Sequence, residues 1–205
     1  MELKYFVIIL ALLSISMLYI LSTYSHPTAI SFSEIAEYED RQVILRGVVC
    51  DHSITTYDSQ ILTLRDINNS DIELSVFVEM ITDVEYGDII DAIGSVQKYK
   101  ESWELVVSHP KNIKIVSSWD NNSSPLWQLA EQPEKYVGLN IRTNGYIDRV
   151  YESFYYLIDA SGRYSLVVYA PPENHHNLTE GTPCTIDGRF LYDSENFQYC
   201  IDQRN

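Results

Sequence analysis

The chain has few of the residues on which common catalytic and metal sites depend. It contains 3 cysteines among 205 residues, and the spacing of Cys50, Cys184 and Cys200 matches no zinc-binding pattern. The sequence has no G-x-S-x-G, P-loop or H-E-x-x-H motif. The pair His175–His176 lies in a loop, where adjacent side chains point apart and cannot by themselves hold a metal ion. We therefore predict a binding protein without catalytic activity, cofactor or metal.

Basic residues are also scarce, and this limits the kind of ligand. The chain has 14 Lys and Arg against 29 Asp and Glu, a formal net charge of −15. A nucleic-acid-binding protein replaces the counterions of phosphates with Lys and Arg, and a strongly negative protein repels a polyanion. The composition therefore disfavours nucleic acid unless one groove is locally basic. The acidic clusters match no EF-hand loop, and we expect them to form solvated surface.

The N-terminal region has no charged residue from Tyr5 to Ser25, in the run YFVIILALLSISMLYILSTYS. Such a run is long enough to cross a bilayer as a helix. Lys4 precedes it and the next basic residue is Arg41, so the positive-inside rule places the N-terminus in the cytoplasm. We predict that residues 1–25 form a cytoplasmic tip and a transmembrane anchor, which contacts the lipid bilayer through residues 5–25. A cleaved signal peptide is the alternative, although its apolar region is ordinarily shorter.

Glycosylation sequons agree with this orientation. The N-x-S/T pattern occurs at Asn68, Asn121, Asn122 and Asn177. A chain rich in Asn and Ser also produces such patterns by chance, so the support is modest. The predicted location is the cell membrane, with a single span and an extracytoplasmic body.

Beyond the anchor, one order of segments occurs twice, in residues 30–116 and 126–205, on either side of a polar linker at 117–125. The first copy has a helical pattern near Ser31, then VILRGVVCD, QILTLRD, IELSVFV and the stretch GDIIDAIGSVQKYKESWELVV. The second has LWQLAEQPEKYVG, LNIRTNGYID, FYYLID, YSLVVY and GTPCTIDGRFLYDSENFQYCI. The alternation of apolar and polar residues predicts five half-buried strands in each copy.

Individual positions of the two copies can be matched by their apolar phase. Gly47 matches Gly145, at the point where the first strand must bend. In the last strand, we match Trp103, Leu105 and Val107 with Phe197, Tyr199 and Ile201. Because apolar residues alternate in the same phase in equivalent strands of the two copies, we predict that both copies bury the same face of each strand.

Five short antiparallel strands leave open edges, and closing the sheet into a barrel removes them. The order of a helix, VILRGVV, two alternating strands, GDIIDAIGSV and a last hairpin resembles the OB-fold of the tRNA-anticodon and helicase type. This resemblance covers residues 32–116 and 125–202. We therefore expect an all-β protein with short helices, in which two tandem five-stranded OB-like barrels follow the transmembrane helix.

The resemblance implies a binding surface on strands two and three of a barrel and in the adjoining loops. In the second copy we expect Tyr155, Leu157, Tyr164, Leu166 and Val168 to point inward, and Tyr156, Val167 and Tyr169 to point outward. The candidate ligand-binding residues are the tyrosines and arginines near this face, namely Tyr146, Tyr151, Tyr156, Tyr169, Arg142, Arg149 and Arg163. Tyrosine also suits any exposed sheet surface, so a purely structural role for these side chains stays open.

Two functions from different classes remain. The anchor and the acidic charge favour an extracytoplasmic binding module whose ligand is a protein or glycan of the cell envelope. The resemblance instead implies a single-stranded nucleic-acid-binding protein that uses the Tyr-rich face of the second barrel. A single span followed by an OB-like barrel is also similar to the haem chaperone of cytochrome c maturation. The haem-linking His followed by a Tyr in that family is missing from the C-terminal sequence FQYCIDQRN.

Overall fold

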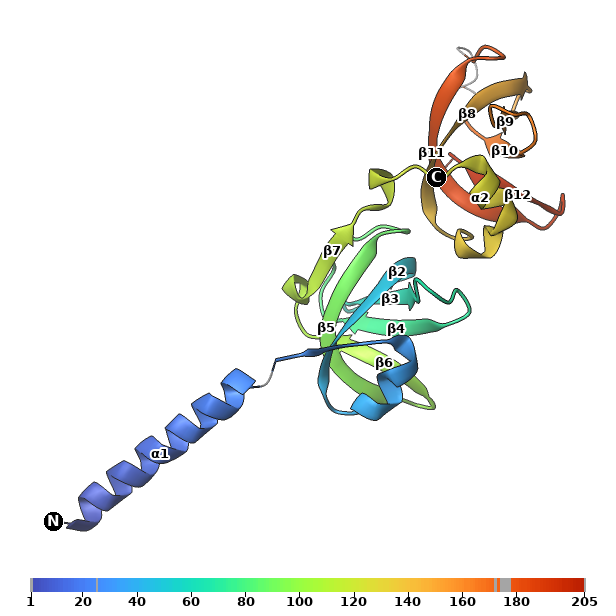
Figure 1. Ribbon diagram of the computed structural model, residues 1–205. Coiled ribbons are helices and arrows are strands. Elements are labelled where there is room, and N and C mark those ends of the chain that lie inside the picture. Colours follow the sequence, from blue (N-terminus) through green and yellow to red (C-terminus); the bar gives the residue numbers. More distant parts are fainter. Residues whose placement is uncertain (1, 25, 172, 174–177, 205) are drawn as a thin grey trace.

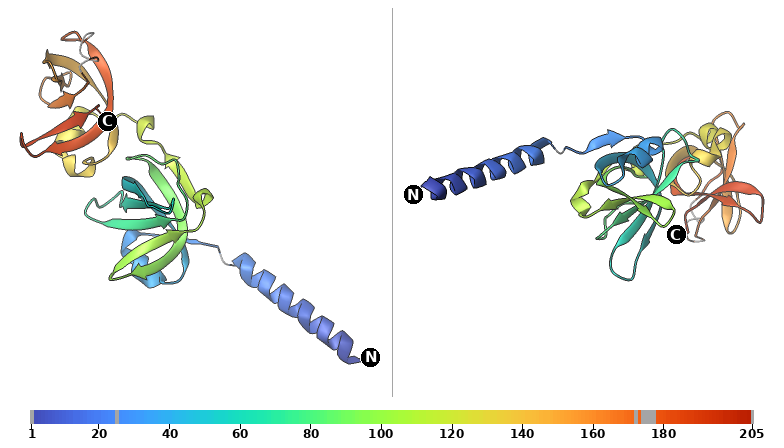
Figure 2. Two further views of the ribbon diagram at one scale, coloured as in Figure 1. Left: turned by 180° about the vertical axis from the view of Figure 1, so that it is seen from behind. Right: turned by 90° about the horizontal axis from the view of Figure 1, so that it is seen from below.

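The computed structural model describes residues 2–24, 26–171, 173 and 178–204. An N-terminal helix is followed by two β-barrels, and the second barrel lies farther from the helix than the first (Figures 1 and 2). The helices and 3-10 turns are α1 (Glu2–Tyr24), η1 (Phe32–Tyr38), η2 (Pro110–Asn112), η3 (Trp119–Asn121), α2 (Leu126–Glu131) and η4 (Pro133–Lys135).

The N-terminal helix α1 forms where the sequence predicts one. In the part of the chain that the structure describes, no helix combines the length and the apolar character that a membrane span requires. The predicted transmembrane anchor at residues 5–25 is therefore not supported.

The first barrel contains the five predicted strands. They are β2 (Gln42–Ile54), β3 (Gln60–Arg65), β4 (Glu73–Val78), β5 (Ile89–Tyr99) and β6 (Ser102–Val107). The pairs β2–β3, β3–β4, β5–β6 and β2–β5 are antiparallel, whereas β4 and β6 are parallel. Strand one thus pairs with strands two and four, and strand three with strand five. This closed Greek-key order is that of an OB-fold barrel.

Two further strands, which the sequence analysis did not predict, enlarge this sheet to seven. The short β1 (Thr28–Ile30) pairs with the first half of β2, which β3 does not reach, and β7 (Ile113–Ser117) pairs with the half of β5 that β6 does not reach. Each added strand covers backbone groups that would otherwise form an open edge. Three residues are too few to show an alternating pattern, which is why the sequence did not predict β1.

The second barrel is formed by β8 (Asn140–Val150), β9 (Phe154–Ile158), β10 (Ser165–Tyr169), β11 (Pro183–Asp193) and β12 (Gln198–Asp202). It is closed in the order β10-β12-β11-β8-β9, with β10 and β12 parallel. This is the strand order of the first barrel. The prediction of two tandem barrels of one topology is confirmed.

The match between Gly47 and Gly145 is also confirmed. A Cβ atom at Gly47 would lie 3.0 Å from the carbonyl oxygen of Arg65, and one at Gly145 would lie 2.8 Å from that of Ile158. Both glycines thus allow the first strand to approach the second closely. A register shift follows each of them, between Val49 and Asp51 and between Ile147 and Val150.

The match proposed for the last strand was wrong by two residues. Gly47 lies opposite Ile90 and Gly145 lies opposite Cys184, so Val96 and Phe190, each six residues further on, occupy equivalent positions. Leu105 pairs with Val96, whereas Phe190 pairs with Ile201 rather than with Tyr199. The cause is the turn: the first hairpin closes at Tyr99 and Ser102, and the second closes over a longer loop between Asp193 and Gln198. A slip of two residues keeps each side chain on the same face, so the apolar phase alone could not reveal it.

Each barrel has its own apolar core, and the core of the second contains the predicted inward positions. Leu62, Leu64 and Val76 have no exposed surface in the first barrel. In the second, the buried side chains include Tyr155, Leu157, Leu166, Val168, Phe190 and Ile201, and Tyr164 packs partly buried against them. Val167 was expected to be exposed but is buried, at 4% exposure. It lies between Tyr156 and Cys200 of the neighbouring strands, whose side chains flank it on the outer face.

The two barrels pack against each other. Cys50, in the second half of the first barrel's β2, belongs to the core cluster of the second barrel. The guanidinium of Arg65 donates to the carbonyl oxygen of Val137 at 3.1 Å, and the N–H of Asn140 donates to the carbonyl oxygen of Tyr86 at 3.3 Å. Gly87 adopts φ +93, and a Cβ atom there would lie 2.7 Å from the carbonyl oxygen of Asn140. The contact between the barrels therefore requires glycine at position 87.

We predict that Gly87→Ala destabilises the chain more than the matched change Gly181→Ala. Both glycines have positive φ, but a Cβ atom at Gly181 meets nothing within 4 Å. Both variants place a Cβ atom on a residue with positive φ, so both lose stability through backbone strain. The difference between their free energies of unfolding therefore measures the clash between the barrels, and we expect it to be about 1–3 kcal/mol. Urea unfolding of the full chain measures both free energies. Equal losses would show that the barrels do not pack closely at this point.

Candidate functional site

The outer face of β9 and β10 carries an aromatic cluster, defined by Tyr151, Phe154, Tyr156 and Tyr169. The rings of Tyr151 and Phe154 are stacked, with centroids 4.6 Å apart and planes 20° apart. Tyr156 contacts both of these rings edge to face, and Tyr169 contacts Phe154 in the same way at 6.1 Å. Phe154 and Tyr169 are directly opposite in the ladder, so the strand register places them together.

Two arginines lie over rings of the aromatic cluster. The guanidinium of Arg149 is 4.5 Å from the ring centroid of Tyr156, and that of Arg204 is 4.8 Å from the ring of Tyr169. Each arginine is also paired with a carboxylate, Arg149 with Asp148 at 3.1 Å and Arg204 with Asp202 at 2.7 Å. Both arginine side chains remain more than half exposed. The face thus has exposed cations whose charge is locally balanced.

One end of the aromatic cluster is fixed by hydrogen bonds to the β11–β12 turn. The Tyr169 hydroxyl donates to Oδ2 of Asp193 at 2.8 Å, and the side-chain amide of Asn196 donates to the same oxygen at 2.8 Å. The amide of Asn196, followed by the Tyr169 hydroxyl, lowers the pKa of Asp193 from 3.8 to about 2. Burial and the bond to Asp193 raise the pKa of the Tyr169 hydroxyl. Asp193 is therefore ionised, and Tyr169 is neutral, at neutral pH.

Four of the seven candidate residues belong to this site, namely Tyr151, Tyr156, Tyr169 and Arg149. The other three lie elsewhere. Arg163 is in the β9–β10 turn beside Ser161, and Arg142 forms a two-point ion pair with Asp187 on β11. Tyr146 is on β8, where it lines a shallow groove together with Trp127 of α2.

Two residues of the site, Phe154 and Arg204, were not among the predicted binding residues. Phe154 could have been found, because it is two residues before Tyr156 in the same predicted strand and so shares its face. Arg204 follows the last strand, where no periodicity predicts a direction. His175, His176 and Asn177 lie outside the described residues. Among those that are described, no group of three or more His, Cys, Asp or Glu side chains could hold a metal ion.

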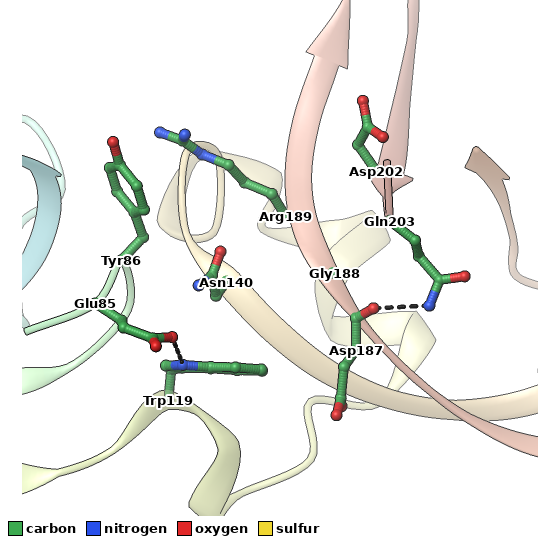
Figure 3. A pocket seen from close by; sticks show the side chains of 9 residues that line it. All are labelled: Glu85, Tyr86, Trp119, Asn140, Asp187, Gly188, Arg189, Asp202 and Gln203. Atoms are coloured by element: carbon green, nitrogen blue, oxygen red, sulfur yellow. Dashed lines mark hydrogen bonds between the residues drawn. The ribbon is translucent and has the colours of Figure 1, made fainter. Parts of the chain in front are cut away.

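A second feature is a cavity of about 490 Å³ between the barrels, here called the inter-barrel cavity. Figure 3 shows its lining: Glu85, Tyr86, Trp119, Asn140, Asp187, Gly188, Arg189, Asp202 and Gln203. The indole N–H of Trp119 donates to Glu85 at 2.7 Å, and the Arg189 guanidinium lies 3.7 Å from the ring centroid of Tyr86. These residues come from both barrels and from the linker, so no local sequence pattern could have grouped them.

No protein-family model and no curated protein sequence matches the chain. Solved structures with a similar chain path include a protein assigned as an aspartyl-tRNA synthetase from Leishmania major Friedlin, with 19% identity over 46% of this chain and a TM-score of 0.38. Another is the aspartyl-tRNA synthetase from Entamoeba histolytica, with 15% identity over 55% of this chain and a TM-score of 0.38. The chain spans 22% and 28% of these two proteins.

A third similar structure is the OBody AM1L10 bound to hen egg-white lysozyme. It has 18% identity over 46% of this chain and 98% of its own, with a TM-score of 0.36. Scores this low carry no functional argument, and the assignment of an OB-fold rests on the strand order of each barrel.

We predict that Asn196→Ala raises the pKa of Asp193 more than Tyr169→Phe does, because the Asn196 amide contributes most to its lowering. Since the folded pKa is below the ordinary value, the ionised carboxylate stabilises the fold above about pH 4 and this contribution is lost as the pH falls toward 2. NMR titration of the Asp193 carboxyl carbon measures the midpoints. Ser194→Ala, an exposed change in the same turn, should leave the midpoint unchanged. A wild-type midpoint near 4 would contradict the hydrogen-bonded turn.

Proposed function

We propose that the second barrel binds single-stranded nucleic acid on its aromatic cluster, and that the protein acts by binding rather than by catalysis. The observation that carries this proposal is the contact of four aromatic rings on the outer face of strands two and three. In OB-folds this face and its adjoining loops bind oligonucleotides and oligosaccharides. The proposal thus rests on the position of the rings in the barrel as well as on their number.

The rings have the exposure that stacking requires. The Tyr151 side chain is exposed at the edge of the cluster, and Tyr156 and Tyr169 are partly exposed along the strands. Every base has a flat π-face, so such a platform accepts many sequences, and each stacked base contributes roughly 1–3 kcal/mol. Arg149 and Arg204 lie over one face of the Tyr156 and Tyr169 rings, and their exposed guanidinium groups could reach the phosphates of a strand stacked on the cluster.

The electrostatic contribution to this binding should be small. The net charge of −15 opposes a polyanion, and both arginines of the face are already paired with aspartates. If two arginines contact phosphates, the logarithm of the binding constant should fall with the logarithm of the salt concentration with a slope of about −1.4. Stacking would therefore supply most of the affinity.

A neutral glycan of the cell envelope is the second candidate ligand. The same charge balance favours it, because a neutral sugar meets no repulsion from 29 acidic residues. An extracytoplasmic location of the barrels would accompany this ligand. The two candidates share the aromatic face and differ in whether the ligand carries phosphates.

We predict that Tyr156→Ala weakens the binding of a fluorescein-labelled 12-mer of deoxythymidine to the full chain about tenfold to a hundredfold, because one stacking ring is lost. Tyr156→Phe should keep the affinity, since the ring stays and only the hydroxyl goes. Fluorescence anisotropy at several salt concentrations gives the affinities and the slope.

Tyr57→Ala is the matched control, because Tyr57 is a tyrosine of the first barrel with 89% exposure. Wild-type affinity for this variant is expected. If the wild-type chain does not bind the 12-mer even at low salt, or if Tyr57→Ala and Tyr156→Ala lose affinity equally, the nucleic-acid proposal fails. Binding of neutral oligosaccharides that Tyr156→Ala abolishes, with no binding of the 12-mer, would establish the second candidate.

A further inference from the structure

The walls of the inter-barrel cavity are held in place before any ligand binds. The backbone N–H of Trp119 donates to Asp88 at 3.1 Å, and its indole N–H donates to Oε2 of Glu85 at 2.7 Å. Asp88 is itself buried, at 3% exposure, which makes it a fixed acceptor. The first bond holds the backbone of Trp119 and the second holds its indole ring, which forms one wall of the cavity; Figure 3 draws the second bond. A preformed wall lowers the entropic cost of binding.

The opposite side of the cavity is fixed in a similar way. Nε of Arg189 donates to the carbonyl oxygen of Gly138 at 3.2 Å, and the flat guanidinium lies over the ring of Tyr86 at 3.7 Å. The side-chain amide of Gln203 donates to the carbonyl oxygen of Asp187 at 2.8 Å, as Figure 3 shows. Arg189 is thereby oriented by one hydrogen bond and one ring contact, neither of which uses its two terminal amino groups.

Several polar groups of the lining have no partner among the residues that the structure describes. They are the two terminal amino groups of Arg189, the side-chain amide of Asn140 and Oε1 of Glu85. The cavity therefore presents free donors on Arg189, a free acceptor on Glu85, an amide that can do both, and the face of an indole. The ligand that fits these groups is flat, with hydrogen-bond acceptors on the edge near Arg189 and donors on the edge near Glu85.

Charge narrows the class of ligand further. Of the carboxylates that line the cavity, Asp187 is paired with Arg142 and Asp202 with Arg204, and the charge of Glu85 offsets that of Arg189. The lining thus has no excess positive charge to attract a phosphate or a carboxylate. Guanine is uncharged, offers the acceptors N7 and O6 to a guanidinium, and carries N–H donors that a carboxylate can accept. Its ring can stack on an indole, as unstacked bases do in protein complexes. Adenine has an amino group where Arg189 requires an acceptor.

We infer that the inter-barrel cavity binds one guanine base, stacked on Trp119 and read by Arg189 and Glu85. The volume of about 490 Å³ lies within the range of small-molecule sites. The inference rests on the proposed nucleic-acid function only for the source of the base, which is a guanine of a bound strand. The cavity would then add a preference for one base to the sequence-tolerant stacking on the aromatic cluster.

Free nucleosides test the cavity separately from the strand. Guanosine, adenosine, cytidine and uridine are titrated into the full chain, and tryptophan fluorescence is followed with excitation at the red edge. We expect guanosine to quench the fluorescence saturably and the other three to do so at least about tenfold more weakly. Trp119→Phe should remove the quenching signal. Trp127→Phe, which changes a tryptophan of α2 outside the cavity, should keep it.

Arginine variants test whether Arg189 recognises the guanine base. Arg189→Lys keeps the positive charge but loses the two-point contact, so guanosine affinity should fall about tenfold. Arg163→Lys, in an exposed turn away from the cavity, should have no effect. Equal responses to all four nucleosides, wild-type quenching in Trp119→Phe, or unchanged guanosine affinity in Arg189→Lys would each overturn the inference.

Tyr156→Ala separates this inference from the proposed function. That variant should bind guanosine as the wild type does while losing affinity for the deoxythymidine 12-mer. If the wild type binds guanosine but no oligonucleotide, the strand-binding proposal fails and the cavity stands as a nucleoside site. If it binds the 12-mer but not guanosine, the inference about the cavity fails alone.

Discussion

The first strand of each barrel pairs along both of its edges, and the rest of the structure depends on this closure. β2 pairs with β3 and with β5, and β8 pairs with β9 and with β11. Each of these strands must approach the next strand in the chain, β3 or β9, closely while it bends, and this close approach requires glycine at positions 47 and 145. Closure removes the free edges and fixes which side of every strand is interior. The aromatic cluster is an outer face only because this assignment is fixed.

Much of that assignment could be predicted from the sequence, and the limits of the prediction have physical causes. Alternation in FYYLID and YSLVVY correctly placed Tyr155 and Val168 inside, because a closed barrel buries one face of each strand. Alternation is blind to shifts of two residues, so the register of the last strand was missed. It also cannot show how deeply neighbours cover an outward side chain, and Val167 is buried for that reason.

The contacts between the two barrels could not be predicted from the periodicity of apolar residues. Residues 117–125 are polar and read as a linker, yet they pack on the second barrel: the N–H of Ser124 donates to the carbonyl oxygen of Arg142, and Arg142 donates to that of Asp120. Trp119 in turn donates hydrogen bonds to Glu85 and Asp88 of the first barrel. Three segments distant in sequence thus meet in one place, and only their tertiary contacts reveal it.

The balance of charge around the aromatic cluster bears on the nucleic-acid binding that we propose for this acidic protein. Asp148 and Asp202 neutralise Arg149 and Arg204 in the free protein, and those arginines also lie over the rings of Tyr156 and Tyr169. A phosphate that approaches either arginine must compete with an aspartate already in contact, so the gain in Coulomb energy is small. A base that stacks on Tyr156 or Tyr169 would use the ring face that the arginine does not cover, or would displace the arginine. If the face binds a ligand as we propose, its chemical selectivity would follow mainly from what can stack on tyrosine and phenylalanine, and the charge of the ligand would have a secondary effect.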